Sequence, residues 1–147
     1  MSTKFLEGGR ILVPVDGSDN SKRALNLAIK LAQRYSVSLT VVYVVYSAVE
    51  LVIDAPNIID RVTREFEKEG KTVLEDSIKS VYKSGVKGKS VLLRGRIGPE
   101  LIRYAESEGF DLIVIGSRGL GAVTRLLRGS VSDYVSDYAK CPVLVVK

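Results

Sequence analysis

The sequence predicts an α/β protein with an open, doubly wound sheet of five parallel strands and helices on both faces. Five short apolar runs are rich in valine, isoleucine and leucine: residues 11–15, 39–46, 91–94, 111–115 and 142–146. They are continuous rather than alternating, which is typical of parallel strands that are covered on both faces. Helical patterns separate them, and right-handed crossovers then give a doubly wound sheet. Because this alternation continues without a linker, we expect residues 1–147 to form a single domain.

Apolar residues at three- and four-residue spacing indicate four helices, at residues 24–35, 59–81, 98–109 and 131–139. Ser18 or Asn20 is expected to cap the first helix. Pro99 stands in the first turn of the third helix, where proline is favoured, and Gly109 ends that helix. Residues 48–57 form one long irregular stretch, which is either a flap over a ligand crevice or a loose connection. Residues 94–98 are expected to form a turn at the sheet edge.

The composition excludes several classes of function. The chain has no histidine, which excludes histidine-based triads and metal-dependent hydrolysis through imidazole. No apolar run reaches about 18 residues, so we expect no membrane-spanning helix. The single cysteine, Cys141, cannot form an internal disulfide and is expected in a reducing cytoplasm. The net charge is +5, but the 22 basic residues are mixed with 17 acidic ones, so nucleic-acid binding is disfavoured.

The most informative motif follows the fourth apolar run. It reads Gly116-Ser117-Arg118-Gly119, and Gly129-Ser130 comes after a further nine residues. A buried strand that ends in glycines and leads into a helix exposes backbone N–H groups that can bind phosphate. Neither a Walker A lysine nor a dinucleotide fingerprint after the first strand is present. We therefore predict a nucleotide phosphate site, with plain turn chemistry as the alternative reason for the glycines.

Charged side chains near this motif have two interpretations each. Arg118 lies between the glycines and is the best placed to neutralise a triphosphate. Arg125 and Arg128 are more consistent with the solvated face of a short helix. Asp16 follows the first strand, where it could bind the ligand or cap the first helix near Ser18, and the sequence favours neither role.

Three parts of the chain resemble the universal stress protein family, in the family's order. Ile11-Leu12-Val13-Pro14-Val15-Asp16-Gly17-Ser18 is similar to its opening strand and turn, and residues 111–119 are similar to its fourth strand and loop. Residues 129–132 and 141–146 resemble its closing helix and strand. This resemblance covers essentially the whole chain. It implies a Rossmann-like fold and, because the glycine motif is intact, the branch of the family that binds ATP.

The resemblance also implies the residues of an ATP site. Pro14 and Val15 would form a wall of the adenine and ribose pocket, and the backbone of Val44 would contact adenine. The family often has histidine just before that position, where this chain has Tyr43. Asp16 would lie near the ribose and phosphates and would hold Mg²⁺ or Mn²⁺ together with the phosphates. The phosphates of ATP, or of AMP or ADP as alternatives, would be held by Gly116, Ser117, Arg118, Gly119, Leu120, Gly121, Ala122, Gly129, Ser130, Val131 and Ser132.

The implied ATP site favours a regulatory or stress-response protein. Such a protein would work through nucleotide-dependent conformation or partner choice. A slow ATPase or phosphotransferase on the same site is the alternative. We assign no catalytic residue, because the chain lacks a histidine base and the phosphate loop contains neither aspartate nor glutamate. A regulatory protein partner is expected, but the sequence does not identify it.

The last apolar run predicts that two copies of the chain form a homodimer. Val143, Leu144, Val145 and Val146 would form a strand at the edge of the sheet, and residues 142–146 carry no charge. An exposed apolar edge favours pairing with another strand. A two-fold homodimer through this strand is the simplest closed arrangement, and the family resemblance implies it as well.

Overall fold

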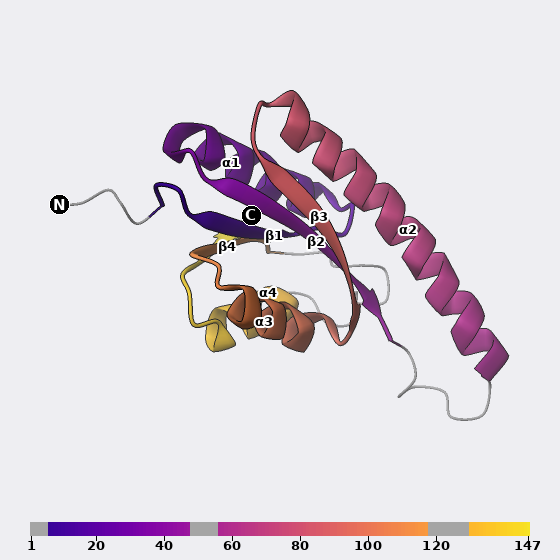
Figure 1. Ribbon diagram of the computed structural model, residues 1–147. Helices are drawn as coiled ribbons and strands as arrows, with labels where there is room; N and C mark the ends of the chain where they lie inside the picture. The colour runs from indigo at the N-terminus through magenta and orange to yellow at the C-terminus, as the bar shows by residue number, and fades with distance from the viewer. Residues whose placement is uncertain (1–5, 48–55, 118–129) are drawn as a thin grey trace.

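The computed structural model describes residues 6–47, 56–117 and 130–147, and the strands in this part of the chain form one sheet (Figure 1). The strands are β1 (Arg10–Pro14), β2 (Ser38–Tyr46), β3 (Gly88–Gly95), β4 (Leu112–Gly116) and β5 (Val143–Val146). Their spatial order is β3-β2-β1-β4-β5, and every neighbouring pair is parallel. The predicted five-stranded parallel sheet is therefore confirmed.

In the described part of the chain, two helices cover each face of this sheet, as predicted for a doubly wound fold (Figure 1). The helices are α1 (Asp19–Tyr35), α2 (Pro56–Lys83), α3 (Ile97–Glu108) and α4 (Ser130–Tyr138). Successive residues of a strand point to opposite faces. Val13 therefore packs in a core under α1 and α2, whereas Leu12 packs in a second core under α3 and α4. Both side chains are fully buried. Within the described residues, no helix is both long enough and apolar enough to span a bilayer.

Helix α1 begins directly after the turn that follows β1, and Ser18 is its N-cap. The Ser18 hydroxyl accepts a hydrogen bond of 3.2 Å from the backbone N–H of Ser21. This bond satisfies one of the N–H groups that a helix leaves unpaired in its first turn. Of the two capping residues that the sequence predicted, Ser18 rather than Asn20 is correct.

We expect Ser18→Ala to lower the free energy of unfolding by about 1 kcal/mol, because the first turn of α1 loses its side-chain acceptor. Urea denaturation at neutral pH measures this change. Ser107→Ala is a suitable control, since the exposed Ser107 hydroxyl bonds only the Tyr104 carbonyl within α3, at 3.2 Å. Equal stability of both variants would contradict the capping role of Ser18.

Strand β3 and helix α2 both begin three residues earlier than the sequence predicted. Strand β3 begins at Gly88 rather than at residue 91, because polar Lys89 and Ser90 also pair with β2. Both side chains are exposed, which a strand at the edge of a sheet tolerates. Helix α2 begins at Pro56, so the last two residues of the predicted irregular stretch 48–57 are helical. Residues 48–55 lie outside the described residues.

Candidate functional site

The candidate site lies at the carboxyl ends of β1 and β4. Strands β2 and β3 lie on one side of β1, and β4 and β5 lie on its other side, so the strand order reverses between β1 and β4. Ligands of open α/β sheets bind in the crevice at such a point. Strand β1 ends at Pro14, one residue before the end of the predicted run 11–15, and β4 ends at Gly116, the first glycine of the motif.

Ser117 joins three segments at this edge of the sheet. Its hydroxyl accepts a hydrogen bond from the Asn20 side chain in the first turn of α1, at 3.5 Å. Its carbonyl accepts one from the Ser132 hydroxyl in the first turn of α4, also at 3.5 Å. The N-termini of two helices therefore lie beside the end of β4. Ser117 and Ser132, two residues of the predicted phosphate site, are in direct contact.

Gly116 allows α1 to approach β4 closely. A Cβ atom at Gly116 would lie 2.9 Å from the backbone carbon of Asn20 and 3.0 Å from its carbonyl oxygen. Real Cβ atoms do not come this close to backbone atoms. The glycine is therefore needed for packing, a reason that is independent of any phosphate. The sequence predicted neither this packing role of Gly116 nor the hydrogen bond from Asn20 to Ser117. Both exist only because α1 packs against β4.

Asp16 closes the turn between β1 and α1. Its Oδ1 accepts a hydrogen bond of 2.9 Å from the backbone N–H of Ser18, and its own N–H donates to the Ser21 hydroxyl at 3.3 Å. Gly17, between Asp16 and Ser18, has a φ of 84°, which favours glycine. The helix cap is Ser18, so capping of α1 by Asp16 is wrong. The half-buried Asp16 carboxylate instead stabilises the turn that follows β1.

Pro14, Val15 and Val44 lie at the same end of the sheet but not on the same face. The N–H of Val15 donates to the carbonyl of Val42 at 2.8 Å, which continues the pairing of β1 with β2. The Val15 side chain is buried in the core under α1 and α2. Val44 and Val131 each pack against the core under α3 and α4. Any pocket wall formed by Val15 would therefore be made of its backbone.

The remaining predicted site residues lie outside the described part of the chain. This set comprises Arg118, Gly119, Leu120, Gly121, Ala122 and Gly129, together with Arg125 and Arg128. Ser130 begins α4, as the sequence predicted. The roles of Ser130 and of the residues outside the described part of the chain remain predictions from the sequence.

Tyr43 is a buried polar residue beside the site for which the sequence predicted no role of its side chain. It lies on β2 directly before Val44 and is 7% exposed. Burial, the charges of Glu69 and Asp16, and a hydrogen bond to Glu69 raise the pKa of Tyr43 to about 12. The hydroxyl therefore remains protonated at neutral pH and can donate a hydrogen bond to Glu69.

The segment 94–98 is a shorter turn than predicted. Arg94 and Gly95 belong to β3, and Arg96 alone separates β3 from α3. Arg94 pairs with Glu67 of α2 at 2.7 Å, and this hydrogen bond lowers the pKa of the Glu67 carboxyl.

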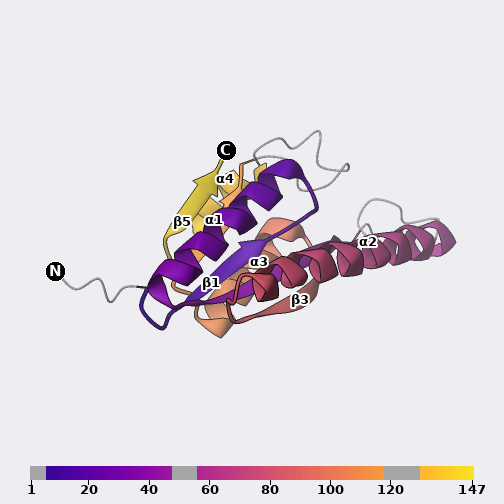
Figure 2. The same ribbon diagram turned by 90° about the horizontal axis from the view of Figure 1, so that it is seen from above.

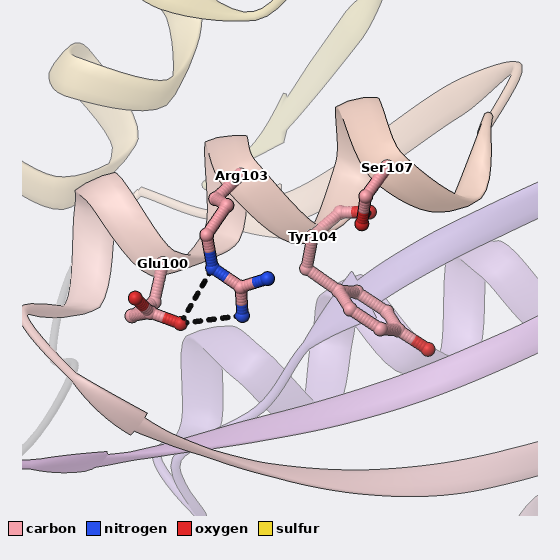
Figure 3. A network of polar contacts seen from close by, with 4 residues as sticks. All are labelled: Glu100, Arg103, Tyr104 and Ser107. Atoms are coloured by element: carbon pink, nitrogen blue, oxygen red, sulfur yellow. Dashed lines mark hydrogen bonds and ion pairs between the residues drawn. The ribbon is translucent and has the colours of Figure 1, made fainter.

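Glu100 in the first turn of α3 covers Gly95. A Cβ atom at Gly95 would lie 2.8 Å from Cγ of Glu100. The same carboxylate accepts hydrogen bonds from Arg103 at 2.7 and 3.1 Å, while the Tyr104 ring points away from this pair (Figure 3). This polar network stabilises the turn and the exposed side of α3.

Fold and site together define a doubly wound α/β protein with Gly116, Ser117 and Ser132 gathered at the carboxyl edge of its sheet. The model of the Universal stress protein family matches residues 8–147, so the chain belongs to the universal stress protein family. It is 34% identical over 145 residues to "Universal stress protein YxiE" of Bacillus subtilis, with 94% of this chain and 98% of the relative covered.

Solved structures agree with this assignment. The universal stress protein UspA from Lactobacillus plantarum is similar with a TM-score of 0.84 and 29% identity, over 96% of this chain and 99% of that one. The universal stress protein from Archaeoglobus fulgidus in complex with dAMP has a TM-score of 0.71 and 25% identity. That similarity covers 95% of this chain and 98% of the other.

Proposed function

We propose that this chain is an ATP-binding universal stress protein that acts as a nucleotide-dependent regulator in a stress response. The contact of Ser132 with Ser117, beside the strand end at Gly116, is the observation that carries the proposal. It brings the first turn of α4 to the loop that follows β4. Backbone N–H groups at a helix N-terminus are a favourable environment for phosphate. The dAMP complex of the related A. fulgidus protein supports an adenine nucleotide as the ligand.

The proposed nucleotide spans the crevice from β2 to α4. Val44 would offer its backbone to adenine, the Pro14–Val15 backbone would line the ribose side, and the glycine loop with Ser132 would hold the phosphates. Asp16 would bind Mg²⁺ or Mn²⁺ jointly with the phosphates. The described residues contain no cluster of three potential metal ligands. Phosphate oxygens and water would therefore complete the coordination, as is usual for Mg²⁺.

Mass spectrometry of the protein purified without added nucleotide tests this proposal. We expect the denatured protein to release ATP, ADP or AMP in an amount close to one per chain. Protein that releases no nucleotide and gains none during incubation with ATP and Mg²⁺ would contradict the proposed function. The same measurement identifies which of the three nucleotides is preferred.

Turnover is the property that separates a regulator from the alternative of a slow ATPase or phosphotransferase. We expect fewer than about one ATP hydrolysed per minute, far below the usual range of enzymes, because the chain has no histidine base. A phosphate-release assay with ATP and Mg²⁺ measures this rate. A rate of several per second that disappears in Asp16→Ala would instead assign an enzyme.

We also propose a homodimer through β5. This strand lies at an edge of the sheet, and its Leu144 and Val145 side chains are 37% and 38% exposed. These residues point to opposite faces, so both faces of the edge offer apolar surface. Antiparallel pairing of two copies of β5 would pair the open edge and bury these side chains.

A cytoplasmic location completes the proposal. Cys141 is the single cysteine, and it packs half-buried against the core under α3 and α4. Burial raises the pKa of its thiol, which keeps the thiol protonated and poorly reactive. Such a cysteine suits a reducing compartment.

A further inference from the structure

Tyr43 connects the candidate site to helix α2 through a close contact with Gly70. A Cβ atom at Gly70 would lie 2.6 Å from Cδ1 and 2.8 Å from Cε1 of the Tyr43 ring. Glycine in a helix interior costs about 1 kcal/mol relative to alanine. The contact explains why α2 carries a buried glycine in its middle. The ring of Tyr43 therefore rests directly on the α2 backbone.

Besides burial, the charges of Glu69 on α2 and of Asp16 in the β1–α1 turn raise the pKa of the Tyr43 hydroxyl. A hydrogen bond to Glu69 acts in the same direction. A phenol hydroxyl can donate a hydrogen bond to a carboxylate, so Glu69 connects Tyr43 to α2.

Two further contacts join the same part of α2 to the site. A Cβ at Gly17, the residue after Asp16, would lie 3.1 Å from Cγ2 of Val73. On the other side, Glu67 of α2 pairs with Arg94 at the end of β3. All of these contacts come from residues 67–73, about two turns of helix. This segment is where α2 is attached to the carboxyl edge of the sheet.

The N-terminal part of α2 projects beyond this attachment. Figure 2 shows α2 extending past the other helices and strands of the described chain. Most side chains before Glu67 are half-buried or exposed, and Ile58 is 58% exposed. Helix segments with few buried contacts open more easily than the core. The stability of this projecting part therefore depends on how firmly residues 67–73 are held.

We propose that Tyr43 is a positioning residue that couples the nucleotide site to helix α2, so that nucleotide binding stabilises the projecting part of α2. The proposal rests on the function proposed above. A nucleotide that contacts the Val44 backbone and Asp16 holds both neighbours of Tyr43 in place, and Tyr43 then holds Gly70 and Glu69. Such coupling is reciprocal, so a partner that binds the projecting part of α2 would change nucleotide affinity by the same factor.

Hydrogen–deuterium exchange of the full chain, with and without saturating ATP and Mg²⁺, tests this coupling. In the wild-type protein we expect ATP to slow exchange of the amides of residues 57–73 by about threefold or more. Tyr43→Phe keeps the ring on Gly70 but removes the hydroxyl. It should still bind ATP, as calorimetry will show, yet lose most of this slowing.

Tyr82→Phe is the matched control. Tyr82 lies on the same helix, and its hydroxyl bonds the Gly88 carbonyl at 3.2 Å, near the opposite end of α2 from the projecting part. This variant should exchange like the wild type in both states. Equal slowing in Tyr43→Phe and wild type, or no slowing in a wild type that binds ATP, would overturn the coupling alone. A folded wild type that binds no ATP would overturn the proposed function and the coupling with it.

Discussion

Gly116→Ala is expected to lower the free energy of unfolding by about 3 kcal/mol. The added methyl group would lie 2.9–3.0 Å from backbone atoms of Asn20. A flexible side chain could turn away from such a contact, but the backbone of Asn20 can yield only if the first turn of α1 moves. That movement would also separate Asn20 from Ser117. Since whole domains are stable by only about 5–15 kcal/mol, the loss is large. Urea denaturation measures it.

The matched control is Gly109→Ala, which also adds one methyl group. Gly109 ends α3 with a φ of 69°, and apart from its chain neighbours no atom of the described residues lies within 4 Å of the position of its Cβ. Its substitution costs only the strain of a left-handed backbone, about 1 kcal/mol. If both variants were destabilised equally, the close approach of α1 to β4 would not be the reason for a glycine at 116.

Val145→Lys is expected to prevent the proposed dimer and leave a monomer. Val143, two residues earlier, packs under α3 and α4, so the exposed Val145 side chain points to the same face at the open edge. A lysine there would place a charge in the proposed interface, and edge lysines are a common device against strand pairing. Light scattering at micromolar concentration should report half the mass of the wild type.

Ile58→Lys is the control for this prediction. Ile58 is 58% exposed on α2, away from β5, so its substitution also adds a lysine at an exposed apolar position. It should leave the dimer intact. A wild-type protein that is monomeric at micromolar concentration, or a Val145→Lys variant that remains dimeric, would reject assembly through β5.

Most of the fold was predictable from the sequence because its strands are buried. Strands β1, β2 and β4 are covered by helices on both sides, so each appears as a continuous apolar run. The edge strand β3 was predicted too short, since Gly88, Lys89 and Ser90 have no apolar signature. Its first three residues are held by pairing with β2, a tertiary effect that local patterns do not contain.

The candidate site was predictable where a motif is local and not where it depends on packing. The glycine motif correctly indicated that Gly116 ends β4 and that Ser130 begins α4. The contact of Tyr43 with Gly70 was not predictable, because it joins a strand and a helix that are far apart in the sequence. The same holds for Asn20, whose contact with Ser117 exists only once α1 lies against β4.

Isothermal titration of ATP with Mg²⁺ into nucleotide-free protein tests the central claim most directly. The wild type should bind one ATP per chain. Gly119→Val should bind none, because a side chain at the second glycine of the motif would occupy the space of a phosphate. Its melting temperature should equal that of the wild type. A Gly119→Val variant that binds ATP as the wild type does, or a folded wild type without any binding, would contradict the nucleotide site.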